Sequence, residues 1–251
     1  MFDFFKKKRE PLELFYHTDI HSHILPGIDD GSPHVERSLE LVRSMREWGL
    51  NRIIATPHVT QDKFENTPEI VTEVYGELKN ALQEKDIDVE LGFAAEYRID
   101  EYFISQVEAD NLMKLPEGYL LIENSYVQEP WNLANTIFQL RMKGHKLILA
   151  HPERYVYYHD KKEMYDKLHS SGVLFQVNVL SLANSYGKEV RKMAEYLIDK
   201  DYVDFLGTDL HRRTHVKQIN DYLASKSYRK TRERLEGRIL NDKIFAESKL
   251  S

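Results

Sequence analysis

Short apolar runs alternate along the chain with longer segments in which apolar residues recur every three or four positions. The short runs have the length and the β-branched content of buried strands, whereas the longer segments have the period of amphipathic helices. This alternation is typical of βα units and predicts a parallel sheet covered by helices, that is, an α/β fold. The seven candidate strands are residues 14–19, 52–56, 88–94, 118–123, 146–150, 173–178 and 204–208.

Two of the predicted helices begin with a clear capping signal. Ser32 can cap a helix that has Pro33 in its first position and ends at Gly49, and Thr67 followed by Pro68 repeats this start signal. Helical patterns also cover residues 130–142, 160–169 and 188–200. The predicted apolar faces of the first two helices are Val35, Leu39, Val42 and Met45, and Ile70, Val74, Leu78 and Leu82.

The chain of 251 residues shows no internal repeat and no Pro/Gly/Ser-rich linker, so one domain over residues 1–251 is expected. Residues 1–10 combine aromatic and basic side chains and are expected to be a poorly ordered terminus, with a docking or membrane-touching segment as the alternative. The polar tail over about residues 215–251 is expected to form solvated surface helices. A specific basic binding site is the alternative interpretation of that tail.

Charge and composition exclude several classes of function. The formal net charge of −6 argues against a nucleic-acid partner, which usually requires clustered basic residues. No apolar run is long enough to span a bilayer, and no secretory signal is present, so a soluble, cytoplasmic protein is expected. The absence of cysteine excludes disulfides, thiolate metal sites and any cysteine nucleophile.

Side chains that commonly bind metal ions fall at the ends of the predicted strands. Because the carboxyl ends of parallel strands share one face, these residues are expected to converge there although they are far apart in sequence. In chain order they are His21, His23, His58, Glu96, Glu123, His151, Asp209 and His211.

Taken alone, each of these residues is more easily explained as a hydrogen-bonded loop residue than as a ligand. The pairs His21/His23 and Asp209/His211 carry more weight, because alternate residues of an extended segment point the same way. Asp30, with Asp29, lies in a Gly-rich turn, where ordinary turn chemistry is the alternative. A mixed imidazole and carboxylate set suits Mn²⁺, Fe²⁺ or Zn²⁺, and such ions could activate the water that replaces a cysteine nucleophile.

A phosphoryl substrate would also need a planar donor for its oxygens. Arg154 follows the predicted ligand His151 by three residues and is the first candidate for this phosphate clamp, with a structural ion pair to Glu153 or another acid as the alternative. Arg212 and Arg213, next to His211, are second candidates for substrate binding, and only one of the two is expected to face the site.

At these motifs the sequence resembles the polymerase and histidinol phosphatase (PHP) superfamily, and more closely its branch of bacterial protein-tyrosine phosphatases from capsule and exopolysaccharide loci. The matching stretches are Asp19-Ile20-His21-Ser22-His23-Ile24-Leu25-Pro26-Gly27-Ile28-Asp29-Asp30-Gly31, Thr56-Pro57-His58, the strand-end Glu, Ala150-His151-Pro152-Glu153-Arg154 and Asp209-Leu210-His211.

The resemblance implies a distorted seven-stranded (β/α) TIM-like barrel of the PHP type and a trinuclear centre, most often with Mn²⁺, with Fe²⁺ or Zn²⁺ as alternatives. It also implies that Arg154 binds the phosphate. Two positions depart from the family pattern: Val59 stands where a second histidine often follows, and the second phosphate-binding arginine has no clear match among residues 212–215. The ligands implied by the resemblance are His21, His23, Asp30, His58, Glu96, Glu123, His151, Asp209 and His211.

The leading expectation is a phosphoric monoester hydrolase that removes phosphate from phosphotyrosine, on a bacterial tyrosine kinase that regulates capsular or exopolysaccharide synthesis. A small-molecule phosphatase, such as one acting on histidinol phosphate, is the runner-up because the same chemistry serves either ester. A non-catalytic, metal-binding regulator is the alternative from another class. A nuclease is disfavoured by the acidic charge.

Overall fold

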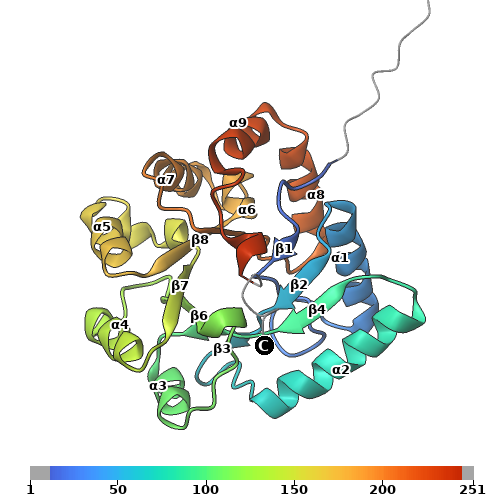
Figure 1. The fold of residues 1–251 in the computed structure, drawn as a ribbon, viewed down its shortest axis with the longest axis horizontal. Helices are drawn as coiled ribbons and strands as arrows, with labels where there is room; N and C mark the ends of the chain where they lie inside the picture. The colour runs from blue at the N-terminus through green and yellow to red at the C-terminus, as the bar shows by residue number, and fades with distance from the viewer. Residues whose placement is uncertain (1–11, 245–251) are drawn as a thin grey trace, which may run out of the picture.

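The strands of this protein lie at the centre of the molecule and are surrounded by helices, as Figure 1 shows for the computed structural model, which describes residues 12–244. Every pairing between the strands is parallel. One sheet has the order β1-β2-β4, with β1 (Thr18–Asp19), β2 (Arg52–Ala55) and β4 (Glu90–Phe93). The other sheet has the order β3-β5-β6-β7-β8-β9, with β3 (His58–Val59), β5 (Glu96–Arg98), β6 (Tyr119–Glu123), β7 (Lys146–Ala150), β8 (Leu174–Asn178) and β9 (Phe205–Gly207).

Each of the seven predicted strands contains one observed strand, and the parallel α/β fold is confirmed. The pairing differs from a single closed barrel, because β3 and β5 continue β2 and β4 after short interruptions and join the other sheet. Pro57 lies in the first interruption and has no N–H to donate to a ladder, which explains why β2 does not run on. Backbone bonds still link the sheets, since Asp209 N donates to His21 O and His23 N donates to Leu210 O.

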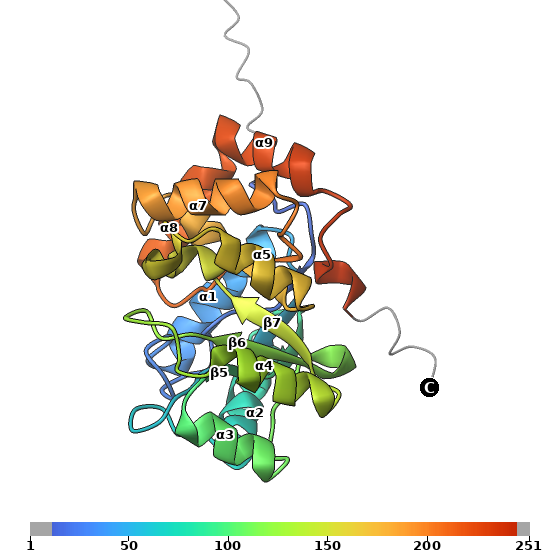
Figure 2. The ribbon, with the colours of Figure 1, turned by 90° about the vertical axis from the view of Figure 1, so that its left-hand side faces the viewer.

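The helices of the described residues pack around the strands. Seen from the side, α7, α8 and α9 lie at one end of the molecule, and α2 and α3 lie at the other (Figure 2). The α-helices are α1 (Val35–Glu47), α2 (Pro68–Glu84), α3 (Glu101–Glu108), α4 (Leu133–Met142), α5 (Glu163–Ser170), α6 (Val179–Leu182), α7 (Lys188–Asp199), α8 (Arg213–Leu223) and α9 (Lys226–Leu235). The 3₁₀ helices are η1 (Pro116–Gly118), η2 (Pro152–Arg154), η3 (Val156–Tyr158) and η4 (Asn241–Lys243).

One of the two predicted helix starts is confirmed and the other is shifted. Thr67 caps α2, where its side chain accepts from Ile70 N. The N-cap of α1 is His34 instead of Ser32, because the Ser32 hydroxyl donates to His34 O and the Ser32 carbonyl closes a turn with Gly27 N. The position predicted for the cap is therefore used by the preceding turn.

The first buried residue of α2 is one position later than predicted. Val71 is fully buried, whereas Ile70, which was predicted for the apolar face, is 42% exposed. Leu78 and Leu82 are buried as predicted. Val71 is seven residues before Leu78, which is two helical turns, and therefore lies on the same side of the helix.

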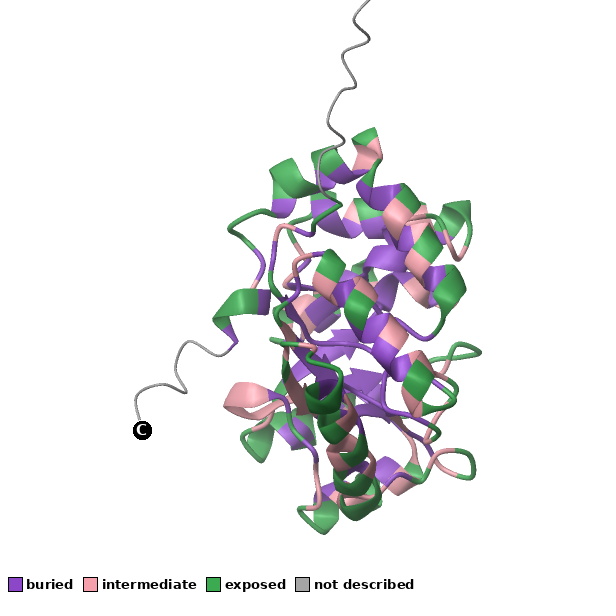
Figure 3. Cartoon of the chain, turned by 90° about the vertical axis from the view of Figure 1, so that its right-hand side faces the viewer, coloured by how far each residue is buried: buried purple, intermediate pink, exposed green. Residues whose placement is uncertain are grey.

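The core lies between the strands and the inner faces of the helices. Figure 3 shows the buried strands and the helices that expose only their outer faces. Ile53 of β2, Leu120 of β6, Phe175 of β8 and Leu197 of α7 are fully buried members of the main cluster. Burying each such side chain contributes roughly 1.5–3 kcal/mol to the free energy of unfolding. Within residues 12–244, no helix is long and apolar enough to cross a membrane.

The charged segment after Thr214 contains α8 and α9, and it packs into the body of the protein. Tyr222, Tyr228 and Leu235 are buried, and the Tyr228 hydroxyl donates to Glu13 O. The surface of these helices carries the charges that the sequence shows, but their inner faces belong to the core. The expectation of a poorly ordered terminus falls on residues 1–10, which lie outside the described residues.

Asn241, in η4, joins the end of this segment to the strands. Its side-chain Nδ2 donates to Thr18 O at 2.9 Å and to Leu206 O at 2.7 Å, and its Oδ1 accepts from Leu206 N at 3.0 Å. Because the residue is fully buried, Asn241→Ala would leave these three backbone groups without a partner. We expect a loss of about 2–4 kcal/mol in the free energy of unfolding, measured by urea denaturation. The matched surface variant Lys243→Ala should change it by less than about 0.5 kcal/mol; equal effects would contradict this prediction.

Candidate metal centre

The candidate ligands converge on one cluster although they come from seven places in the chain. The reason is the parallel topology, which brings the carboxyl ends of the strands to the same side. The nine residues are His21 and His23 after β1, Asp30 in the next turn, His58 of β3, Glu96 of β5, Glu123 of β6, His151 after β7, and Asp209 and His211 after β9.

Glu96 lies at the centre of this cluster and is fully buried. Its Oε2 is 3.2 Å from His21 Nε2, 3.3 Å from His23 Nε2 and 3.0 Å from His58 Nδ1. Its Oε1 is 2.8 Å from His151 Nε2. One carboxylate therefore contacts four imidazole rings from three other segments.

Asp209 forms the second carboxylate of the inner cluster. Its Oδ1 lies 3.6 Å from His21 Nε2, 3.4 Å from His23 Nε2 and 3.4 Å from His211 Nδ1. Both Asp209 and His151 have a positive φ, of 48° and 34°, although neither is glycine. Such a backbone costs roughly 1–3 kcal/mol per residue and is typical of functional sites. In both residues it occurs just past the end of a strand, where the side chain reaches the cluster.

The outer edge of the cluster is more accessible. Asp30 Oδ1 lies 3.4 Å from His58 Nε2 and 3.7 Å from His211 Nε2, and the Asp30 side chain is 54% exposed. Glu123 is buried, and its Oε1 lies 3.5 Å from His58 Nδ1. The cluster therefore has a dry inner side and one side that opens toward solvent.

Several atoms of the cluster are close together without hydrogen bonding to one another. Glu96 Oε2, Glu123 Oε2 and His58 Nδ1 are buried and have no hydrogen-bond partner, although Glu96 Oε2 and His58 Nδ1 are only 3.0 Å apart. Buried polar atoms normally have a hydrogen-bond partner. Oxygen and nitrogen atoms that lie this close together without one are arranged as the ligands of a cation would be. Imidazole and carboxylate ligands suit divalent ions such as Mn²⁺, Fe²⁺ and Zn²⁺.

Three groups of ligand atoms in the described residues each lie within 4.8 Å of one another, and they share members. Burial raises the pKa of Glu96, but the neighbouring His21 and His58 outweigh this effect and hold that pKa well below its usual range. The central carboxylate is thus an anion, which favours cation binding. The groups are His23, His58 and His211; His21, His23 and Glu96; and His58, Glu96 and Glu123.

Two residues outside the nine candidate ligands orient the inner histidines. With a proton on Nδ1, His23 donates to Asp29 Oδ2 at 2.7 Å, and His21 donates to Gln176 Oε1 at 2.6 Å. Such bonds fix the tautomer and direct Nε2 toward a metal ion. A signal for Gln176 exists in the sequence, because it is a polar residue between the apolar Phe175 and Val177 of β8.

Asp29 does more than close the turn in which it lies. Its Oδ1 accepts from Gly31 N at 2.9 Å, as an ordinary turn residue would do. Its Oδ2, however, accepts from the His23 ring and from His58 N at 3.2 Å. The carboxylate therefore connects the turn to two candidate ligands.

Of the three arginines expected near the phosphate, Arg154 is the one that reaches the cluster. Its Nη1 donates to Asp209 Oδ2 at 3.2 Å and does not pair with Glu153, whose Oε1 accepts from Asn178 N and Ser181 Oγ. Arg213 pairs with Glu40 of α1 at the surface.

Arg212 Nε donates to His215 Nε2 at 3.1 Å, so Arg212 stays a prediction for the second clamp, whereas Arg213 is directed to Glu40 at the surface. A further arginine, which the sequence reasoning missed, lies on the strand that carries Glu96. Arg98 Nη2 donates to Glu123 Oε1 at 3.1 Å, and its side chain is 32% exposed. Arg98 follows Glu96 by two residues in β5. This spacing puts both side chains on one face of the strand, so the sequence contained a signal that Arg98 lies near the cluster.

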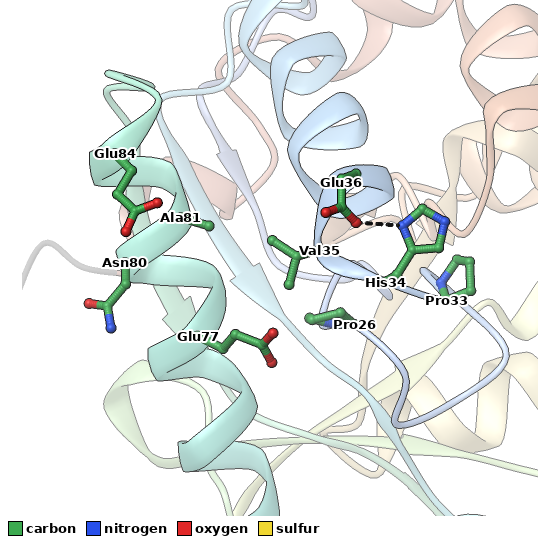
Figure 4. A pocket seen from close by; sticks show the side chains of 9 residues that line it. All are labelled: Pro26, Pro33, His34, Val35, Glu36, Glu77, Asn80, Ala81 and Glu84. Carbon is green, nitrogen blue, oxygen red and sulfur yellow. Dashed lines mark hydrogen bonds and ion pairs between the residues drawn. The ribbon is translucent and has the colours of Figure 1, made fainter.

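A pocket of about 630 Å³ between the start of α1 and α2 is separate from the cluster (Figure 4). It is lined by Glu36, Glu77 and Glu84 among other residues and by none of the nine candidate ligands. Its acidic lining would repel a phosphate group. A phosphate site in this pocket is therefore disfavoured.

The family comparison agrees with the motifs at this site. The family described as capsular polysaccharide synthesis, CpsB/CapC, matches residues 17–242. The putative tyrosine-protein phosphatase CapC of Staphylococcus aureus is 29% identical over 232 residues, which cover 90% of each chain. The tyrosine-protein phosphatase YwqE of Bacillus subtilis (strain 168) is 30% identical over 194 residues, which cover 77% of this chain and 76% of the relative.

A solved structure is also similar over most of the chain. It comes from work on YwqE from Bacillus subtilis and CpsB from Streptococcus pneumoniae, described as unique metal-dependent tyrosine phosphatases. The TM-score is 0.75 at 27% identity, and the match covers 88% of this chain and 94% of that chain. The matched region contains every candidate ligand, and the chain belongs to the CpsB/CapC family of capsular polysaccharide synthesis.

Proposed function

We propose that this protein is a metal-dependent protein-tyrosine phosphatase whose active site is the cluster around Glu96. The observation that carries the proposal is the set of buried side-chain atoms without a hydrogen-bond partner on Glu96, Glu123 and His58, in a cluster whose member Asp209 accepts from the guanidinium of Arg154. Membership of the CpsB/CapC family supports the reaction class. The absence of cysteine excludes a phosphocysteine intermediate.

Three divalent cations would be held by the nine candidate ligands, with Mn²⁺ as the first choice and Fe²⁺ or Zn²⁺ as alternatives. When bound, such ions polarise phosphoryl oxygens and make water acidic enough to attack phosphorus. The ligands proposed are His21, His23, Asp30, His58, Glu96, Glu123, His151, Asp209 and His211.

The residues around the ligands have distinct tasks in this proposal. Arg154 binds the phosphoryl oxygens through its planar guanidinium, which matches their geometry. Asp29 and Gln176 hold the His23 and His21 rings in their orientation. Arg98 keeps a positive charge beside Glu123.

The substrate proposed is phosphotyrosine on a bacterial tyrosine kinase that regulates capsular or exopolysaccharide synthesis, in the cytoplasm. Relatives named tyrosine-protein phosphatase and the family description support this substrate class. The half-exposed Asp30 at the outer edge leaves one side of the cluster open, as a protein substrate requires. We also propose that the chain is a single domain and that its two linked sheets form a distorted barrel.

A comparison of substrates tests this function. The purified protein should cleave a phosphotyrosine peptide and lose this activity on treatment with a chelator. Activity should return with Mn²⁺, because the cation would replace the charge and Lewis acidity that the ligands alone lack. Release of phosphate is measured for the peptide and for histidinol phosphate at matched concentrations. A preference for histidinol phosphate by orders of magnitude would reverse the assignment, and inactivity with Mn²⁺, Fe²⁺ and Zn²⁺ would end it.

A further inference from the structure

The guanidinium of Arg154 contacts two tyrosine rings that come from different loops. Arg154 Cζ lies 4.5 Å from the centre of the Tyr126 ring and 4.1 Å from the centre of the Tyr186 ring. Tyr126 follows β6, and Tyr186 lies between α6 and α7. A flat cation over aromatic rings is held by their negative faces, while its N–H groups stay free to donate in its own plane.

Each tyrosine hydroxyl also contacts a candidate metal ligand. The Tyr126 hydroxyl lies 3.2 Å from His151 Nε2, the same nitrogen that contacts Glu96 Oε1. The Tyr186 hydroxyl donates to Asp209 Oδ2 at 3.4 Å, and this oxygen also accepts from Arg154 Nη1. Each tyrosine therefore contacts Arg154 with its ring and a candidate ligand with its hydroxyl: His151 for Tyr126 and Asp209 for Tyr186.

We propose that Tyr126 and Tyr186 form an aromatic clamp that positions Arg154, and that the Tyr126 hydroxyl donates a hydrogen bond to the phosphoryl group of the substrate. The proposal rests on the function proposed above. If His151 Nε2 gives its lone pair to a metal ion, it has none left to accept a hydrogen bond from Tyr126. The hydroxyl then needs a new acceptor, and an oxygen of a phosphoryl group held by Arg154 would lie next to it.

The exposure of the two rings fits this division of tasks. Tyr126 is 37% exposed as a whole residue, so that part of it faces solvent while its hydroxyl lies against His151. Tyr186 is partly buried, and its hydroxyl already has an acceptor in Asp209. Tyr126 is accordingly a substrate-binding residue, and Tyr186 is a positioning residue that acts through Arg154.

Binding of inorganic phosphate tests the clamp without relying on turnover. Phosphate is titrated by calorimetry into the metal-loaded protein and into the variants Tyr126→Phe, Tyr126→Leu and Tyr186→Leu. The metal content of each preparation is measured in parallel. Tyr75→Phe is the matched control, because its hydroxyl donates to Leu91 O on another part of the molecule.

Tyr126→Phe keeps the ring and should weaken phosphate binding about 5-fold, whereas Tyr126→Leu also removes the ring and should weaken it about 30-fold. Tyr186→Leu should weaken binding about 10-fold, and the control should leave it unchanged. Metal content should stay at the level of the wild-type protein in Tyr126→Phe and Tyr186→Leu.

The ring contribution should vanish when the guanidinium is absent. In an Arg154→Ala background, Tyr126→Leu should therefore weaken binding only about 5-fold further, through the lost hydroxyl. Wild-type phosphate affinity in Tyr126→Phe would overturn the hydroxyl contact, and a full 30-fold effect in the Arg154→Ala background would overturn the clamp. These readouts do not depend on the identity of the substrate, so an inactive phosphotyrosine assay would count against the proposed function and not against the clamp.

Discussion

Glu96→Gln is expected to abolish phosphatase activity, with a fall in kcat of at least about 10³-fold, and to remove most of the bound metal. The substitution preserves the shape of the side chain but removes the negative charge that four imidazole rings surround. It also replaces one carboxylate oxygen with an amide nitrogen, which cannot bind a cation. Metal content by mass spectrometry and phosphate release from a phosphotyrosine peptide give the two readouts.

Glu90→Gln is the matched control for this substitution. Glu90 lies on β4, which precedes β5 in the chain; it is exposed and pairs with Arg52 instead of with the cluster. This variant should keep the metal content and the rate of the wild-type protein. If Glu96→Gln also retained both, the assignment of Glu96 as the central ligand would be wrong.

Arg154→Ala is expected to lower kcat/KM by about 10²–10³-fold while the metal content stays unchanged. The guanidinium is the cation beside Asp209 that can take phosphoryl oxygens in two parallel hydrogen bonds. Arg154→Lys should recover only part of the loss, because a lysine keeps the charge but not the planar pair of donors. Steady-state kinetics on the phosphotyrosine peptide measure both variants.

Arg213→Ala separates a local role of Arg154 from a general effect of positive charge. Arg213 pairs with Glu40 at the surface, so its removal should leave kcat/KM within about 2-fold of the wild-type value. A large loss of kcat/KM in Arg213→Ala, with little loss in Arg154→Ala, would mean that Arg213 and not Arg154 binds the phosphate.

All strands of the described residues except β3 and β5, and most of the helices, could be predicted from the sequence because their signals are local. Thr67 and Pro68 mark the start of α2 by capping and backbone geometry that need no partner elsewhere in the chain. The pairing of the strands could not be read in the same way. Pro57 is a local signal for the end of β2, but the pairing of β3 in the other sheet depends on contacts with β5, which is far away in sequence.

The convergence of the inner candidate ligands could be predicted because each lies next to the end of a strand, and the parallel topology then brings them together. The supporting residues were missed for a physical reason. The role of Asp29 follows from a hydrogen bond to the His23 ring, and that of Gln176 from one to the His21 ring 155 residues away. The choice between Arg212 and Arg213 could not be made from the sequence, since a position beside His211 gave no information about the direction of either side chain; the Arg213 side chain is directed to Glu40.

The central claim is that the cluster around Glu96 is a metal centre on which hydrolysis depends. The most direct test is the metal content of protein purified without added ions, measured together with its phosphatase activity. About three equivalents of divalent metal per chain are expected, with activity that falls in proportion as a chelator removes them. Protein that is free of metal and still fully active would contradict the account.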